Sequence, residues 1–201
     1  MEEETSNFSS LVKKRILVRE FKEPRTGKFD SDIKKIANNG VKIPTAGFSR
    51  GIELLTILDT KKIKKISVIA NEKKYIDKGL APWISWSEGV IIILINKNSY
   101  LERYSKKDKK SSLNPEKWDI PYWYIDAGAS LMNILLSAED KELGSGFLGG
   151  HNLDLEALKK EFLIPKSLEI LGLVTIGVRK NIVKKHSTEK KKLIHSEIYG
   201  E

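Results

Sequence analysis

The sequence contains no cysteine among its 201 residues. Disulfide bonds, thiolate metal sites and cysteine nucleophiles are therefore excluded. It also lacks any run that approaches the ~18 consecutive apolar residues that a membrane-spanning helix needs. The chain begins with an acidic cluster, Met1 followed by three glutamates, whereas a secretory signal peptide begins with basic residues. These features predict a cytoplasmic protein without a membrane partner.

Side chains that commonly carry catalysis are scarce. The three histidines, His151, His186 and His195, show no spacing typical of metal ligands. No G-x-S-x-G nucleophile motif and no pair of carboxylates stands out. The sequence therefore predicts neither a metal site nor a catalytic side chain.

The net charge is +9, because 36 lysines and arginines outnumber 27 aspartates and glutamates. Such an excess is a feature of nucleic-acid-binding proteins. However, the lysines are concentrated in the segments 97–117 and 179–192, and neither segment interleaves aromatic residues with its charges as a stacking surface does. We therefore expect solvated faces and no nucleic-acid partner, with a basic nucleic-acid-binding domain as the less favoured alternative.

Length and composition indicate a single domain. A chain of 201 residues that is 40% hydrophobic and 31% charged can bury a sizeable core. We expect one domain over residues 1–201, with tails at 1–8 and 180–201. The lysine-rich segment 99–118 is long for a loop and is predicted to be either a lid or disordered. Most of the large aromatic residues around this segment are expected to pack in the core or at an interface, with a stacking wall over a flat ligand as the alternative.

Hydrophobic patterns predict the sheet. Val90–Ile95 is an uninterrupted apolar run, which is typical of a central strand covered on both faces. Further strands are predicted at 52–58 and 168–177, and an amphipathic helix is predicted at 155–162.

The longest helical pattern lies within 126–150. A helix is predicted from Asp126, as its N-cap, to Leu143, followed by a glycine-rich run. Its glycines indicate either a tight turn between packed elements or the close approach of backbone N–H groups to a flat ligand. The segment 144–149 also satisfies G-x-G-x-x-G. That dinucleotide fingerprint requires a preceding strand, whereas a helix precedes it here, so we reject the Rossmann interpretation. The apolar residues of the helical stripe are Ala127, Leu131, Ile134, Leu135 and Ala138.

The same stretch resembles a known family. Residues 126–138 follow the pattern D-x-G-x-x-x-x-N-x-x-L-x-A, and L-G-S and the pair Gly149-Gly150 come after it. This resembles the central helix and following loop of the nitroreductase family, whose members bind FMN in a homodimer. The resemblance covers about Leu11 to Tyr199. It implies an α+β fold with a mainly antiparallel sheet flanked by helices, dimerised through the long central helix.

Basic residues near both ends of the chain match the positions that hold the FMN phosphate in this family. Arg15 and Arg19 match the outer basic positions after the first helix, and Leu17, which stands where a serine is usual, can contribute its backbone. Guanidinium groups bind phosphate oxygens bidentately. The alternative is a half-buried strand edge with two surface arginines. Lys190 and Lys191 match a basic pair near the C-terminus, with a plain charged tail as the alternative.

The segment 44–52 resembles the family motif P-[ST]-x-x-N-S-Q-P-W, which reaches the flavin of the other subunit. Phe48, Arg50 and Gly51 depart from it, because asparagine, glutamine and proline are common there. The resemblance therefore implies trans contacts from the residues that fit the motif or lie within it. These are Pro44, Thr45, Ala46 and Ser49.

Two further contacts with the flavin ring are implied by the resemblance. Asn71 begins a short match, N-E-K-K, to a segment whose asparagine contacts the ring; a plain surface helix is the alternative. The N–H of Gly150, or failing that Gly149, is expected to donate to flavin N5. The alternative there is a turn glycine with positive φ.

The resemblance implies an FMN-dependent oxidoreductase that passes hydride from NAD(P)H through flavin N5 to a small-molecule acceptor by a ping-pong route. A cofactor that carries the reaction agrees with the scarcity of catalytic side chains. The alternative within flavoproteins is a carrier or sensor that binds flavin without reductase turnover.

Overall fold

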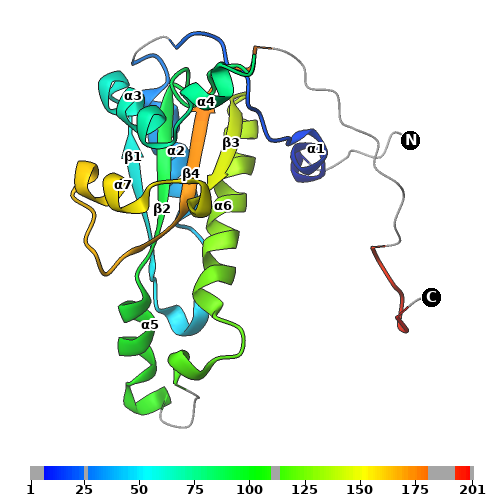
Figure 1. Ribbon diagram of the computed structural model, residues 1–201. Helices are drawn as coiled ribbons and strands as arrows, with labels where there is room; N and C mark the ends of the chain where they lie inside the picture. Colours follow the sequence, from blue (N-terminus) through cyan, green and yellow to red (C-terminus); the bar gives the residue numbers. More distant parts are fainter. Residues whose placement is uncertain (1–6, 25–26, 110–113, 181–192, 200–201) are drawn as a thin grey trace, which may run out of the picture.

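The computed structural model describes residues 7–24, 27–109, 114–180 and 193–199. It contains a four-stranded antiparallel sheet with the strand order β1-β2-β4-β3, flanked by helices (Figure 1). The α+β class with a mainly antiparallel sheet and a long helix is confirmed. The strands are β1 (Ile52–Ile57), β2 (Gly89–Ile95), β3 (Gly144–Gly149) and β4 (Glu169–Gly177). The α-helices are α1 (Asn7–Lys14), α2 (Asp30–Gly40), α3 (Thr60–Ile69), α4 (Lys73–Ile76), α5 (Lys97–Tyr104), α6 (Tyr122–Asp140) and α7 (Leu155–Phe162). The 3-10 helices are η1 (Ala46–Phe48), η2 (Lys107–Lys109), η3 (Pro115–Lys117) and η4 (Gly150–Asn152).

Strand β2 lies inside the sheet, and all of its residues are buried. Its side chains alternate between two hydrophobic cores, because successive residues of a strand point to opposite faces. Val90, Ile92 and Leu94 pack into one core beside α3 and α7, whereas the isoleucines between them pack into a second core beside α2 and α6. The prediction of a central strand covered on both faces is confirmed.

Helix α6 begins earlier than the sequence pattern predicts. It follows Pro121, which occupies the N-cap position and disfavours helical conformation in the residue before it. Asp126 is therefore not the N-cap, and that prediction is wrong. It lies buried one turn inside the helix, where its carboxylate accepts hydrogen bonds from the Ala46 N–H at 3.0 Å and the Tyr100 hydroxyl at 2.7 Å.

The end of α6 also differs from the expected glycine stop after Leu143. The helix ends at Asp140, and Glu142 takes the left-handed conformation with φ 56°. The N–H of Leu143 then donates to the carbonyl of Ala138 at 2.9 Å, which is the hydrogen-bond pattern of a Schellman motif. A glutamate therefore performs the role that the sequence pattern had assigned to glycine.

The glycine-rich run after α6 is an edge strand, β3, and the prediction of a tight turn is wrong. The N-terminal segment crosses this strand closely. The Val18 N–H donates to the carbonyl of Ser145 at 2.8 Å, and a Cβ on Gly146 would lie only 2.4 Å from the carbonyl oxygen of Val18. Glycine is required at 146 because a second backbone approaches the strand there.

The segment 99–118 contains most of α5 together with η2 and η3 among its described residues. Aromatic side chains in this segment and at the start of α6 pack edge to face: the ring centroid of Trp118 lies 4.9 Å from that of Tyr104 and 5.1 Å from that of Tyr122. These contacts agree with a packing role for the aromatics. A lid function for the segment stays a prediction. Within the described part of the chain, no helix combines the length and apolarity needed to cross a membrane.

Candidate functional site

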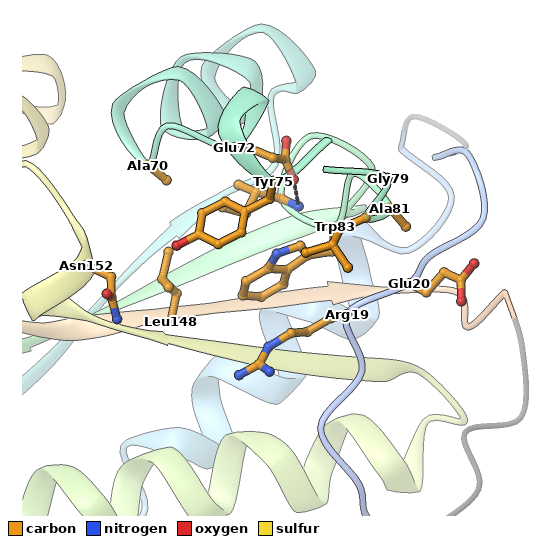
Figure 2. A pocket seen from close by; sticks show the side chains of 12 residues that line it. Arg19, Glu20, Ala70, Glu72, Tyr75, Gly79, Ala81, Trp83, Leu148 and Asn152 are labelled. Carbon is orange, nitrogen blue, oxygen red and sulfur yellow. Dashed lines mark hydrogen bonds between the residues drawn. The ribbon is translucent and has the colours of Figure 1, made fainter. Parts of the chain in front are cut away.

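A cavity of about 580 Å³ opens between the N-terminal segment, the α3–α4 region and β3 (Figure 2). Its volume falls within the ~300–1,000 Å³ that is usual for ligand and cofactor pockets. Its wall combines one guanidinium, one buried carboxylate and several aromatic or aliphatic groups. These residues include Arg19, Glu72, Tyr75, Trp83, Leu148 and Asn152.

Arg19 reaches the cavity from the extended segment that follows α1. Val18 and Phe21, on either side of it, are fully buried and therefore anchor this segment on the sheet. The guanidinium carbon of Arg19 lies 5.7 Å from the centroid of the Trp83 ring, a cation–π contact. Figure 2 shows the two side chains next to each other at the cavity. A cation in this position can hold an anionic group of a ligand.

Arg15 and Leu17 lie in the same segment but outside the cavity wall as far as the described residues define it. Arg15 is half-buried, and Leu17 is 41% exposed and forms an isolated parallel bridge with Ser145. The segment thus has the character of a strand edge, which was the alternative interpretation. That pairing with β3 is also what delivers Arg19 to the cavity.

Glu72 is a site residue that the sequence analysis missed. Its side chain is 2% exposed, and its two carboxylate oxygens accept the backbone N–H groups of Ile84 at 2.5 Å and Ser85 at 3.0 Å. A glutamate within a lysine-rich stretch gives no signal of burial, because its partners lie 12 and 13 residues further along the chain.

Asn71 lies next to the cavity, and its backbone adopts a strained conformation. Its neighbours Ala70 and Glu72 line the wall, whereas Asn71 is exposed and left-handed, with φ 51°. Its N–H donates to the carbonyl of Val68 at 2.9 Å and so ends α3. Asparagine tolerates this conformation better than most residues. The exposed helix α4 begins only at Lys73, so the surface-helix alternative describes the lysines of this match and not Asn71.

Gly149 and Gly150 lie between Leu148 and Asn152, both of which line the cavity. Neither glycine has a positive φ, so the interpretation of a strained turn glycine is wrong. A different constraint acts at Gly150, where a Cβ would lie 2.7 Å from the carbonyl oxygen of Ile170. At Gly149 the nearest atoms to a Cβ would belong to the ring of the His151 side chain, at 2.9 Å.

The second predicted cofactor-binding segment, 44–49, lies far from this cavity within one chain. The hydrogen bond from Ala46 to Asp126 places η1 beside the first turns of α6. The ion pair between Arg179 and Glu139 places the ends of β4 and α6 together, at the other end of that helix. Figure 1 shows α4, beside the cavity, toward one end of α6 and α5 toward the other end. The 19 residues of α6 span roughly 28 Å at about 1.5 Å per residue.

Several contacts hold the loop around η1 in a strained conformation. Gly47, Phe48 and Arg50 all have positive φ, of 62°, 58° and 52°. The Gly47 carbonyl accepts from Nε of Arg103 at 2.6 Å, and the Thr45 hydroxyl accepts the Arg50 N–H at 3.1 Å. Non-glycine residues in this region persist only where surrounding structure fixes them. The result is that Phe48, at 82% exposed, projects into solvent.

Tyr100 connects this loop to α6. Its side chain is fully buried, and burial raises its pKa, which the neighbouring Asp126 carboxylate raises further. The hydroxyl therefore stays protonated at neutral pH and donates a hydrogen bond to Asp126.

The other predicted cofactor-binding residues lie either in the loop around η1 or outside the described part of the chain. Pro44 is exposed, and Thr45, Ala46 and Ser49 are half-buried in the same loop. Lys190 and Lys191 lie outside the described residues. In the described ranges, no group of three or more histidine, aspartate and glutamate side chains is arranged to hold a metal ion.

The sequence model of the nitroreductase family matches residues 12–178. The chain belongs to this family. Among solved structures, a nitroreductase-like protein from Streptococcus mutans superimposes with a TM-score of 0.73 at 16% identity, covering 94% of this chain and 98% of that chain. A nitroreductase family protein from Streptococcus pneumoniae gives a TM-score of 0.69 at 16% identity, with coverages of 94% and 99%. An NADH oxidase candidate from Clostridium acetobutylicum gives 0.67 at 23% identity, with coverages of 94% and 99%. No curated protein sequence matches significantly.

As a nitroreductase-family protein, the chain is an oxidoreductase. Two residues of its family-like pattern have structural partners in this chain. Asp126 holds Ala46 and Tyr100, and the Asn133 amide donates to the carbonyls of Asn39 at 3.3 Å and Lys42 at 3.0 Å. Asn133 thus ties α6 to the last turn of α2 and to the residues that follow it.

Proposed function

We propose that this nitroreductase-family chain is an FMN-dependent oxidoreductase that transfers hydride from NAD(P)H to a small-molecule acceptor in a ping-pong sequence. The observation that carries the proposal is the cavity whose wall combines Arg19 and aromatic side chains with Leu148 and Asn152, the residues that flank Gly149-Gly150. When bound, FMN supplies the hydride-transfer chemistry, which the side chains of this cavity do not provide by themselves.

The described residues of the cavity fit such a cofactor. Arg19 supplies a cation for the phosphate, and Trp83, Tyr75 and Leu148 supply flat or apolar surface for the ring system. The one buried carboxylate, Glu72, is already satisfied by two backbone N–H groups. We propose that Arg15, the backbone of Leu17, Lys190 and Lys191 complete the phosphate site around Arg19, and that Asn71 meets the ring.

We assign the backbone N–H of Gly150, or failing that Gly149, as the donor to flavin N5. The support is positional: the residues on both sides of this pair line the cavity. A donor without a side chain can approach the ring edge while leaving its face open to the nicotinamide and the acceptor. The close carbonyl of Ile170 leaves no room for a Cβ at position 150.

We further propose a homodimer in which each chain completes the cavity of the other. Pro44, Thr45, Ala46 and Ser49 lie too far along α6 to reach the cavity of their own chain, so their contacts would be made in trans. One face of α6 carries apolar residues that this chain leaves uncovered: Ile125 is 51% and Met132 is 44% exposed. A second copy that packs there would cover both residues.

Reconstitution with FMN tests the proposal. The purified full-length chain is incubated with excess FMN and separated from free flavin, and the bound flavin per chain is measured by absorbance. The complex is then titrated anaerobically with NADH and with NADPH. We expect retained flavin, bleaching by at least one donor, and recovery of absorbance when a quinone is added. Retained flavin without bleaching would indicate a carrier or sensor, and absence of retained flavin would reject the FMN assignment.

A further inference from the structure

Glu72 is an acidic residue in the wall of a cavity that is proposed to receive an anion. A negative charge there would repel the anion, so a different role is expected for this carboxylate. A buried carboxylate is costly unless hydrogen-bond donors satisfy it. Here both donors are backbone N–H groups of consecutive residues, Ile84 and Ser85. These residues directly follow Trp83, so Glu72 fixes the backbone that carries the indole ring.

Trp83 in turn restricts Arg19. The Trp83 side chain is buried, at 8% exposed, and its ring would lie 2.8 Å from a Cβ on Gly146, so β3 closes it from one side. Arg19 is exposed and has many rotamers of similar energy. The cation–π contact at 5.7 Å selects among these rotamers and holds the guanidinium at the cavity.

We propose that Glu72 is a positioning residue for anion recognition: it holds Trp83, and Trp83 holds the Arg19 guanidinium in the orientation that receives the phosphate of the cofactor. The identity of the anion rests on the proposed function. The chain of contacts from Glu72 to Arg19 is present in the protein without any ligand, so it can also be tested there.

The effect of Glu72→Gln on FMN affinity has opposite signs if Glu72 acts through its negative charge and if it acts by positioning Trp83. Removal of a negative charge near a phosphate site should tighten FMN binding. The amide, however, can accept from only one of the two N–H groups and presents its own donor to the other. If Glu72 acts by position, Glu72→Gln weakens FMN binding about tenfold relative to riboflavin, which lacks the phosphate.

Glu20→Gln is the matched control. Glu20 lines the same cavity and pairs with Lys180 at 3.4 Å, so its substitution removes the same charge while both hydrogen bonds of Glu72 remain. We expect this variant to bind FMN at least as tightly as the parent. Trp83→Leu is the second variant, because it keeps both Glu72 hydrogen bonds and removes the indole. It is expected to lower the preference for FMN over riboflavin in the same direction as Glu72→Gln.

The readout in the flavin-free protein is amide hydrogen exchange at Ile84 and Ser85, together with the NMR signal of the Arg19 Nε–H. In Glu72→Gln we expect exchange at the two amides to accelerate about tenfold and the Arg19 signal to move or broaden. In Glu20→Gln both should match the parent.

The outcomes separate this inference from the proposed function. A parent that binds neither flavin rejects the FMN assignment, and the exchange data then decide the role of Glu72 alone. Parent-like exchange and an unmoved Arg19 signal in Glu72→Gln overturn the positioning role. A parent that binds FMN while Glu72→Gln binds it equally well overturns it too, as does a Trp83→Leu variant with an unchanged preference for the phosphorylated flavin.

Discussion

The hydroxyl of Tyr100 donates to the carboxylate of Asp126 across 2.7 Å, and both residues are buried. The same carboxylate oxygen accepts the Ala46 N–H. Asp126 therefore joins three segments that are distant in the sequence: α6, α5 and the loop that carries η1. Because this loop holds two non-glycine residues in left-handed conformations, its geometry depends on such anchors.

Asp126→Asn is expected to destabilise the protein by about 2 kcal/mol, because two hydrogen bonds to a charged acceptor, worth about 1.5–3 kcal/mol each, are replaced by two to a neutral amide oxygen, worth about 0.5–1.5 kcal/mol each. The free energy of unfolding is measured by urea denaturation. Asp140→Asn is the control, since Asp140 is exposed on the same helix, and it should change stability by less than about 0.5 kcal/mol. Equal stabilities of the two variants would show that the buried carboxylate is not an anchor.

Stability should fall at alkaline pH in a way that depends on Tyr100. Its pKa is raised above the model-compound value of 10.0 by burial and by Asp126. The stabilisation is therefore complete below pH 10 and is lost as the pH rises above it, because only the unfolded chain then releases the proton. The difference in unfolding free energy between the parent and Tyr100→Phe, measured from pH 8 to 11, should shrink above pH 10. A difference that stays constant over this range contradicts the assignment.

Local patterns predicted the central sheet well. Strand β2 is apolar on both faces, and this is visible in its own sequence. Val90, Ile92 and Leu94 pack into one core, and the isoleucines between them pack into the other. The family resemblance, carried by 126–150, correctly indicated the fold even though the boundaries of its helix and turn were wrong.

The errors and omissions share a physical cause, which is that the deciding partner lies elsewhere in the chain. Gly146 belongs to a strand because the backbone of Val18 crosses it. The local sequence around Asp126 is typical of a helix N-cap, but its hydrogen-bond donors, Ala46 and Tyr100, lie 80 and 26 positions away in the sequence. Glu72 is buried for the same kind of reason. Sequence periodicity reports which face of an element is apolar, but it does not report which backbone groups will meet a polar side chain.

Arg19→Ala should weaken FMN binding by roughly one to two decades, as expected for loss of a charge-assisted hydrogen bond worth about 1.5–3 kcal/mol. Riboflavin binding should change little, because it lacks the phosphate. Both affinities are obtained by fluorescence titration. Lys22→Ala serves as the control: Lys22 lies three residues further on and lines a different cavity. An Arg19→Ala variant that binds FMN like the parent removes Arg19 from the phosphate site.

The two glycines of the pair should respond differently to alanine. At Gly150 the new Cβ would lie 2.7 Å from the backbone carbonyl of Ile170, which cannot move without shifting β4. Gly150→Ala should therefore cost about 1–3 kcal/mol through overpacking. At Gly149 the obstacle is the side chain of His151, which can rotate away, so Gly149→Ala should be close to neutral. Thermal unfolding of both variants measures the contrast, and the reverse order would contradict it.

Met132→Glu tests the proposed homodimer. Met132 is 44% exposed on the same face of α6 as Ile125, and the Cβ position of Gly128 between them meets no atom within 4 Å. A charge buried at a helix–helix interface without a partner is strongly unfavourable. We therefore expect light scattering to show a dimer for the parent and a monomer for Met132→Glu, together with loss of most FMN binding, because the contacts from 44–49 would be absent. Val68→Glu is the matched control, since Val68 is 77% exposed on α3, and it should remain dimeric and bind FMN normally. A monomeric parent that is saturated with FMN would show that one chain forms the complete site.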